Sequence, residues 1–336
     1  MSAHPRVSVL LPVRDAAATL AVTLASVARQ TVRDLECVVV DDGSRDASTA
    51  IVAALAADDP RFVLVRQPRH GLVAALRAGV VRCRGEFVAR MDGDDVMRRT
   101  RLARQLAALD AAPELAAVGC HVRPLPRLRD GLGRSEYDAW LGTIRTADDV
   151  RREAFVECPL AHPTWLVRAA VLRAHPYREV PWPEDYDVLL RWLAAGLRIG
   201  VVPVRLLAWR EHPARLSRTD PRYGLDRFLA AKVHFLCTGF LATHAEFVLW
   251  GYGSTGRALV AALRGHGRRP VAIVELHPGR IGNTIAGAPV IPPAALGGLP
   301  RRPLLVSVVG VGPRAEIRAE LAGLGYRDGV DFLCVA

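Results

Sequence analysis

Apolar runs of strand length alternate with segments of helical spacing through the first part of the chain. The runs predict buried strands over 7–13, 35–44, 61–67 and from 87 onward, and the segments between them predict helices over 16–31, 46–59 and 71–85. This alternation is typical of βαβ units that build a parallel sheet. In such sheets ligands bind beside the carboxyl ends of the strands, so the residues that follow each run are the candidates for chemistry.

The pattern changes twice along the rest of the chain. Residues 121–158 are less regular, contain Pro124 and Pro126, and predict one helix around 136–144. Strand and helix patterns return over 162–172 and 184–196, and a second strand–turn–helix series begins at residue 246. We therefore expect a first domain over 1–217, a connecting helix within 218–243 and a smaller α/β domain over 244–336.

Composition and charge exclude several classes of protein. The chain has 336 residues, 51% of them hydrophobic, which is ample for two packed domains. Its formal net charge is +11, but Lys232 is the only lysine and the arginines are scattered, so we do not expect nucleic-acid binding. The N-terminus lacks a signal-peptide layout, and no apolar window approaches the ~18–20 residues of a membrane span. These features predict a cytoplasmic protein with at most peripheral contact to the inner membrane face.

The spacing of the cysteines predicts neither disulfides nor a zinc site. They are isolated from one another and form no CxxC pair, and most lie in apolar surroundings: Cys37, Cys83, Cys120, Cys158, Cys237 and Cys334. This pattern predicts reduced cysteines in hydrophobic cores rather than disulfides or a zinc site.

Acidic residues gather at the ends of two predicted strands. Asp41 and Asp42 follow the second strand, and Asp92, Asp94 and Asp95 follow the fourth in the string "DGDD". Residues two apart in an extended segment face the same side, so Asp92 and Asp94 can reach one ligand. Carboxylate oxygens of this kind suit Mg²⁺ or Mn²⁺. A solvated Asp-Gly turn explains the string equally well when it is considered alone.

Four separated segments occur in a meaningful order, each beside a predicted strand end. They are "VSVLLPVRDAAATLAVTLASVARQT", "VVVDDGSRDAS", "GEFVARMDGDDV" and "PEDYDVLLRW". In these motifs the chain resembles the family 2 glycosyltransferases of the GT-A fold over roughly residues 5–215. The resemblance implies an α/β fold with a mostly parallel sheet flanked by helices. It also implies a nucleotide-diphosphate-sugar donor, a divalent metal and a cytosolic catalytic domain.

The resemblance assigns the donor side residue by residue. Pro12 and Arg14 would line the nucleotide pocket, and Asp42 or its neighbour Asp41 would hydrogen-bond the base or the ribose. One segment, "RQPRHGLVAALRAGV", departs from the asparagine-rich pattern that is common in the family.

Basic residues take the place of those asparagines. Gly71 is kept, and Arg66, Arg69 and His70 are the side chains available to meet phosphate. For any one of these three, a merely solvated side chain is the competing interpretation.

The resemblance places the metal ligands in the acidic string "DGDD". Asp94 would contact the metal directly, Asp92 would contact the ribose or the metal, and Asp95 would orient them. His212, in "WREHPARLS", would be a third metal ligand or a diphosphate contact. A structural role for this histidine is the alternative.

The residues that the resemblance assigns to the acceptor sugar or alcohol lie in the second half of the first domain. Asp185, in "WPEDYDVLLRW", aligns with the general base that removes the acceptor proton, and Glu184 and Asp187 compete for that role. The alternative is that Glu184 and Asp185 only stabilise the N-terminus of a helix by their negative charge. His162 and Trp182 would shape the acceptor pocket, although a hydrogen-bonded loop histidine explains His162 as well. The chain contains no QxxRW string, which marks processive synthases among the relatives, so transfer of a single sugar is favoured.

The last domain carries a glycine-rich turn. Gly251, Gly253 and Gly256 follow a predicted strand and open a helix, and Glu275 ends the next strand. This context is typical of a Rossmann-like domain that binds a nucleotide or NAD. The same glycines also serve a tight turn without any ligand. No tyrosine stands four residues before Lys232, which excludes the Tyr-x-x-x-Lys pair of a short-chain dehydrogenase.

The sequence thus predicts a metal-dependent inverting glycosyltransferase. It would move one sugar from a nucleotide-diphosphate-sugar to a hydroxyl of a polysaccharide, a lipid-linked glycan or a small metabolite. Two alternatives stay open at this point. One is a non-catalytic sensor that binds nucleotide-sugars, and the other is an NAD-dependent oxidoreductase that acts through the C-terminal domain.

Overall fold

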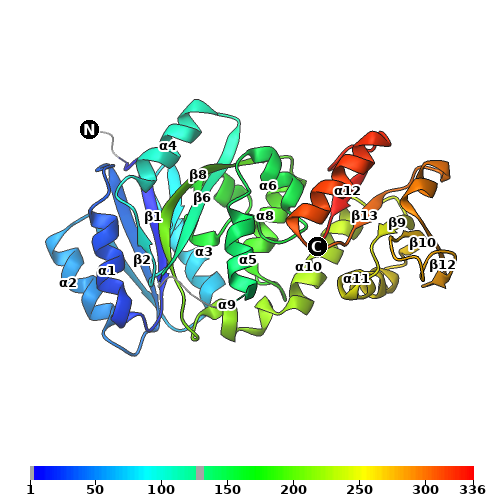
Figure 1. Cartoon of the computed structure of the whole chain (residues 1–336). Coiled ribbons are helices and arrows are strands. Elements are labelled where there is room, and N and C mark those ends of the chain that lie inside the picture. The colour runs from blue at the N-terminus through cyan, green and yellow to red at the C-terminus, as the bar shows by residue number, and fades with distance from the viewer. Residues whose placement is uncertain (1–3, 126–131) are drawn as a thin grey trace. The chain divides into compact units, whose positions relative to one another are not determined.

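A computed structural model of the chain describes residues 4–125 and 132–336 (Figure 1). The chain forms two compact units. The first comprises Met1–Val150, Leu160–Val180 and Glu184–Thr219, and the second comprises Arg151–Pro159, Pro181–Pro183 and Asp220–Ala336. Two short segments that precede residue 217 therefore pack with the C-terminal unit. The expected domain boundaries stay a prediction.

The first unit is built on one eight-stranded sheet. Its strands are β1 (Val7–Val13), β2 (Leu35–Asp42), β3 (Phe62–Gln67), β4 (Phe87–Arg90), β5 (Val96–Met97), β6 (Leu115–Leu125), β7 (Leu166–Arg168) and β8 (Arg198–Arg210). Their order is β3-β2-β1-β4-β7-β6-β8-β5. The pairs among β1 to β4 and the pair β6–β8 are parallel, whereas β7 and β5 run antiparallel to their neighbours.

Helices accompany this sheet as the alternating pattern predicts. They are α1 (Ala17–Ala28), α2 (Ser48–Asp58), α3 (Leu72–Arg82), α4 (Arg101–Ala111), α5 (Leu132–Leu141), α6 (Ala147–Glu153), α7 (Ala169–Ala174), α8 (Glu184–Ala194) and α9 (Leu216–Thr219), with a short 3₁₀ helix, η1 (His162–Thr164). Every residue of β1, β2 and β4 is buried, because the strands are covered on both faces. The predicted strands and helices of the first ninety residues are therefore confirmed to within a few residues at their ends.

A buried polar network fixes the register of β1, β2 and β4 near their amino ends. Ser8 Oγ donates to Glu36 Oε1 at 2.6 Å, and the Gly85 N–H donates to Ser8 Oγ at 2.8 Å. A Cβ atom at position 85 would lie 2.5 Å from the Ser8 nitrogen, so only glycine allows this approach. The fixed register brings the carboxyl ends of these strands to one common edge of the sheet.

The segment that the sequence predicts to be irregular contains an unpredicted long strand. β6 continues to Leu125 and pairs in parallel with β8 along its whole length, including Pro124 opposite Trp209. The pairing with β8 is a contact between distant segments, which the local pattern around the prolines does not reveal. Pro126 and the rest of 126–131 lie outside the described residues, and α5 begins earlier than the predicted helix.

The second unit has a six-stranded sheet of its own. Its strands are β9 (Glu246–Trp250), β10 (Arg269–Val274), β11 (Thr284–Ile285), β12 (Ala288–Ile291), β13 (Leu304–Val306) and β14 (Phe332–Cys334), in the order β11-β12-β10-β9-β13-β14. Its helices are α10 (Leu225–Thr238), α11 (Ser254–Gly265) and α12 (Val311–Gly323), with the 3₁₀ helices η2 (Pro221–Tyr223) and η3 (Pro293–Gly298). All pairs except β11–β12 are parallel, as expected for a smaller α/β unit.

Two general features complete the description. All six cysteines are unpaired, and all but Cys237 are buried. Among the helices that the structure describes, none combines the length and the apolarity that crossing a bilayer requires.

Candidate functional site

The loops that follow β1, β2 and β3 are tied together at the carboxyl edge of the first sheet. The Arg45 N–H donates to Asp15 Oδ1 at 2.8 Å, which links the loop after β2 to the loop after β1. The His70 N–H donates to Asp42 Oδ1 at 2.8 Å, which links the loop after β3 to the end of β2. This edge is where ligands bind in sheets of this type.

The acidic turn lies directly after β4 at the same edge. One carboxylate oxygen from each of Asp92, Asp94 and Asp95 lies within 4.8 Å of the others. The side chains of Asp92 and Asp94 are 27% and 24% exposed, whereas Asp95 is buried. The turn therefore presents two carboxylates to solvent above a third that is enclosed.

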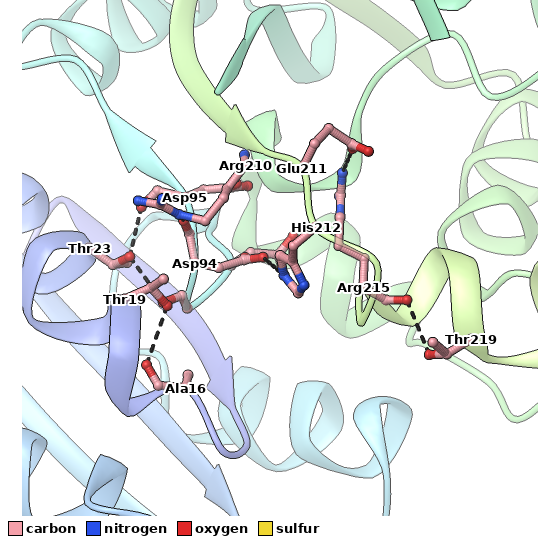
Figure 2. Close-up of polar contacts among 12 residues, drawn as sticks. Ala16, Thr19, Thr23, Asp94, Asp95, Arg210, Glu211, His212, Arg215 and Thr219 are labelled. Carbon is pink, nitrogen blue, oxygen red and sulfur yellow. Dashed lines mark hydrogen bonds and ion pairs between the residues drawn. The ribbon is translucent and has the colours of Figure 1, made fainter. Parts of the chain in front are cut away.

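Hydrogen bonds from two sides hold the backbone of this turn (Figure 2). On one side, Thr23 Oγ1 in α1 donates to the carbonyl oxygens of Asp95 and Gly93, at 2.7 and 3.0 Å. On the other side, the Arg210 N–H at the end of β8 donates to Asp95 Oδ1 at 2.8 Å, and Arg210 Nε donates to the Asp94 carbonyl at 2.8 Å. The carboxylates are thus presented by a fixed backbone.

His212 joins the acidic turn from the far end of the sequence. Its Nε2 atom lies 3.0 Å from Asp94 Oδ2, and Figure 2 shows the two side chains pointing toward each other. Nearby, Arg215 pairs with Glu211 and lies 4.5 Å above the ring of Trp209. The structure thus brings together the four residues that the sequence assigns to the metal side.

Burial, followed by the crowding of like charges, governs the titration of the turn. Burial raises the pKa of Asp95 well above its ordinary value, and the charges of Asp92 and Asp94 raise it further. Burial and then Asp92 also raise the pKa of Asp94. Among the described residues, none hydrogen-bonds the buried Asp95 Oδ2 atom. Carboxylate oxygens and one imidazole nitrogen under this repulsion fit Mg²⁺ or Mn²⁺, whose charge would relieve it.

Asp41 accepts hydrogen bonds from residues that follow it in the chain, and Asp42 accepts them from the end of β3 and the loop after it. Asp41 accepts from the Ser44 N–H at 2.9 Å and from the Thr49 hydroxyl. Burial raises its pKa, but these hydrogen bonds outweigh burial and leave the pKa below its ordinary value.

Asp42 accepts more hydrogen bonds than Asp41 does. It accepts from Gln67 Nε2 at 2.7 Å and from the backbone N–H groups of His70 and Gly71, each at 2.8 Å. A carboxylate has about four acceptor positions, so little of Asp42 is left for a ligand. The contact of either aspartate with a base or a ribose stays a prediction.

The remaining donor-side candidates lie along the same edge. Pro12 is buried within β1, and Arg14 is exposed just after it. Arg66, Arg69 and His70 are exposed at the end of β3 and in its loop. Their contact with phosphate stays a prediction.

Asp185 lies in the first turn of α8 and is partly exposed. Its Oδ1 atom accepts the Tyr186 N–H at 2.8 Å, which leaves Oδ2 for another partner. Burial raises its pKa to about 7, the charge of Glu184 acts in the same direction, and Arg90 opposes both. A carboxylate with a pKa near the working pH is suited to act as a general base.

Asp187, the competing candidate, has a different environment. It is fully buried and lies 2.8 Å from both Arg178 and Arg191. Burial raises its pKa, but these two arginines outweigh burial and lower it overall. A paired carboxylate of this kind anchors the helix and is a poor proton acceptor.

The two acceptor-pocket candidates belong to different units of the chain. His162 is buried, with Nε2 2.7 Å from the Tyr177 hydroxyl and Nδ1 3.7 Å from Glu184. Burial, helped by Arg90, lowers its pKa well below the ordinary value, so the ring is neutral. Trp182 belongs to the C-terminal unit, where its ring lies 5.2 Å from that of His234. Their contact with an acceptor stays a prediction.

The sequence analysis missed one buried cation, Arg90. Its side chain is 5% exposed, and its Nη1 atom lies 2.6 Å from Asp92 Oδ1. Arg101, which is also buried, donates to the Arg90 carbonyl at 2.9 Å. The available signal was an arginine that ends the apolar run "FVAR" directly before the acidic string.

The glycine-rich turn of the second unit is closely packed. Gly251 has a φ of 87°, and a Cβ at position 256 would lie 2.5 Å from the Gly251 oxygen and 2.7 Å from Ser307 Oγ. Gly253 precedes α11, and Glu275 pairs with Arg280 at 2.9 Å. Packing alone accounts for glycine at 251 and 256, so nucleotide binding by this turn stays a prediction.

Comparison with known proteins gives a consistent result. A family model described as glycosyl transferase family 2 matches residues 8–175. The chain is 26% identical over 235 residues to the putative glycosyltransferase EpsE of Bacillus subtilis (strain 168), covering 67% of this chain and 80% of that protein. It is 37% identical over 115 residues to the succinoglycan biosynthesis protein ExoO of Rhizobium meliloti (strain 1021), covering 34% of this chain and 32% of that protein.

A solved structure shares the fold. It is that of residues 1–349 of TarS from S. aureus, crystallised in complex with UDP-GlcNAc. The superposition has a TM-score of 0.57 at 16% identity and covers 78% of this chain and 72% of that one. The likeness confirms the predicted GT-A fold class.

The crowding of the acidic turn makes a testable prediction about stability. Because the folded state holds protons on Asp95 that the unfolded chain has released, stability falls as the pH rises above the ordinary carboxyl value of 3.8. Asp95→Asn removes this cost and keeps an oxygen for the Arg210 N–H. In the presence of a chelator at pH 7, we expect urea titrations to show a higher free energy of unfolding for this variant than for the wild type.

Asp187→Asn is the matched control with the opposite sign. The lowered pKa of Asp187 means that its stabilisation is present above pH 3.8 and is lost as the pH falls. Its replacement should cost about 3 kcal/mol at pH 7, because two arginines lose their partner. Equal destabilisation by both substitutions would contradict the proposed crowding at Asp95.

Proposed function

Because the chain belongs to glycosyl transferase family 2, we propose that it transfers one sugar, with inversion, from a nucleotide-diphosphate-sugar to a hydroxyl group. The protein is a glycosyltransferase by family. The observation that carries the finer proposal is the presence of two kinds of carboxylate in one unit. The acidic turn after β4 fits a divalent cation, and Asp185 has a pKa of about 7.

The acidic turn supports donor binding. Asp92, Asp94 and His212 are the residues that would hold Mg²⁺ or Mn²⁺, and Asp95 lies beneath them. A bound divalent cation would neutralise the negative charge of the diphosphate leaving group. The complex of TarS with UDP-GlcNAc, which has the same fold, supports a nucleotide-sugar as the donor. Arg14, Arg69 and the loop held by Asp42 surround the same edge of the sheet.

Asp185 supports the chemical step. Its carboxylate would take the proton of the acceptor hydroxyl while that oxygen attacks the anomeric carbon of the sugar. The bond from this carbon to the diphosphate oxygen breaks in the same displacement, and the electron pair leaves with the nucleotide diphosphate. Attack from the face opposite to the leaving group inverts the configuration. Glu184 keeps the proton affinity of Asp185 high through its charge.

The acceptor we propose is a hydroxyl of a growing polysaccharide or a lipid-linked glycan. The resemblance to a succinoglycan biosynthesis protein supports this class, and a small metabolite is the alternative. Family membership favours an enzyme over the non-catalytic sensor. None of the comparisons supports NAD as a ligand of the second unit.

Substitution of Asp185 tests the proposed base. Asp185→Asn keeps the size of the side chain and the acceptor for Tyr186 N–H but cannot take a proton. We expect the rate of transfer to fall by about 10²–10⁴-fold. Binding of the donor should stay within about twofold, because no donor contact is removed. Transfer is measured by release of the nucleotide, and binding by calorimetry.

Glu184→Gln distinguishes the two candidates for the base. We expect a smaller loss of rate and a fall in the pKa of Asp185, because a like charge is removed. Undiminished turnover in Asp185→Asn together with loss in Glu184→Gln would move the base to Glu184.

The pH dependence of transfer follows from the pKa of Asp185. A carboxylate accepts a proton only when it is ionised, so the base is present above about pH 7 and is lost as the pH falls below it. We expect kcat/KM to rise about tenfold per pH unit up to about pH 7 and then to level off. A rate that is independent of pH across this range would exclude Asp185 as the base.

A further inference from the structure

Arg90 is a charged residue in an apolar location. It ends β4, the strand between the parallel β1 and the antiparallel β7, and its backbone N–H donates to the Trp165 carbonyl at 2.8 Å. Its side chain is 5% exposed. Arginine is almost never buried without a partner, because removing a charge from water costs far more than packing returns. The partners of Arg90 therefore explain why it is there.

The first partner is on the donor side. Arg90 Nη1 lies 2.6 Å from Asp92 Oδ1, and Asp92 is the first carboxylate of the turn that fits a divalent cation. This ion pair limits the rotation of the carboxylate. Arg90 thus fixes the side chain of Asp92, as Thr23 and Arg210 fix the backbone of the same turn.

The other partners are on the acceptor side. Arg90 interacts electrostatically with Glu184, Asp185 and Tyr177. Glu184 lies 3.7 Å from His162, which in turn lies 2.7 Å from the Tyr177 hydroxyl. Because His162 is neutral, it supplies no positive charge here, and Arg90 is a cation that acts on Asp185 from outside α8.

We propose that Arg90 is a positioning residue for sugar transfer, which holds Asp92 in place for the donor and whose positive charge also acts on Asp185. This inference rests on the proposed function. One buried cation then serves both sides of the reaction. It restrains a carboxylate that would bind the donor, and it lowers the proton affinity of the proposed base.

Two substitutions separate the two roles. Arg90→Met removes the charge and the hold on Asp92, whereas Arg90→Lys keeps the charge on a chain that lacks the planar fork. Arg178→Gln is the matched control, because it also removes an arginine that pairs with an α8 carboxylate, Asp187, which keeps Arg191. Thermal melting and circular dichroism establish that each full-length variant is folded.

The acid limb of the pH–rate profile tests the acceptor side. The probe is whichever of UDP-glucose, UDP-GlcNAc, GDP-mannose and dTDP-glucose the wild type hydrolyses fastest. In Arg90→Met we expect the limb to move up by about one pH unit, which is about a tenfold lower rate at pH 6. The limb should stay in place in Arg90→Lys and Arg178→Gln. A folded Arg90→Met with the wild-type limb would overturn this role.

Calorimetric titration with Mn²⁺ alone tests the donor side and needs no donor sugar. In Arg90→Lys we expect about three- to tenfold weaker binding, because charge is kept while Asp92 is released, and Arg178→Gln should bind as the wild type does. If Arg90→Lys binds Mn²⁺ as tightly as the wild type does, Arg90 does not hold Asp92 in place. This result decides the question even if Arg90→Met fails to fold. If Asp185→Asn keeps its activity, the proposed base is wrong, and the Mn²⁺ titration still decides the role of Arg90.

Discussion

Mutual repulsion among three carboxylates is the constraint on which the rest of the first unit depends. Asp92, Asp94 and Asp95 place oxygens within 4.8 Å of one another at the end of a fully buried strand. Backbone hydrogen bonds from Thr23 and Arg210 prevent the turn from relaxing. Such a cluster raises its own proton affinity unless positive charge is supplied. The distant end of β8 and a buried arginine in β4 both meet this need, which explains why distant parts of the chain converge here.

The acidic residues of this unit form two groups, which differ in how many hydrogen-bond donors and positive charges surround each carboxylate. Asp42 and Asp187 accept several donors or pair with two arginines, and they hold loops and helices in place. Asp95 and Asp185 have raised pKa values because burial and like charges outweigh their hydrogen bonds. Carboxylates whose environments push their pKa values apart are the usual basis of acid and base assignments at an active site. The same residue type therefore serves the framework in one group and chemistry in the other.

Local pattern and motif order predicted much of this arrangement. The strands over 7–13 and 35–44 were predictable because both faces are covered, which gives continuous apolar runs. The placement of His212 beside Asp94 followed from the family resemblance. β8, its pairing with β6, and the contacts of Arg90 were not predictable, because each depends on residues far apart in the sequence. The hydrogen bonds that Asp42 accepts from the loop after β3 were not predictable for the same reason.

Calorimetric titration of nucleotides and nucleotide-sugars, with and without Mn²⁺, into the wild type and Asp94→Ala tests the central claim most directly. If the acidic turn binds the donor through a divalent cation, one nucleotide will bind only when Mn²⁺ is present, and Asp94→Ala will lose that binding. The identity of the nucleotide then follows from the same experiment. Binding that needs no Mn²⁺ and survives Asp94→Ala would contradict the claim, and it would place the nucleotide away from the acidic turn.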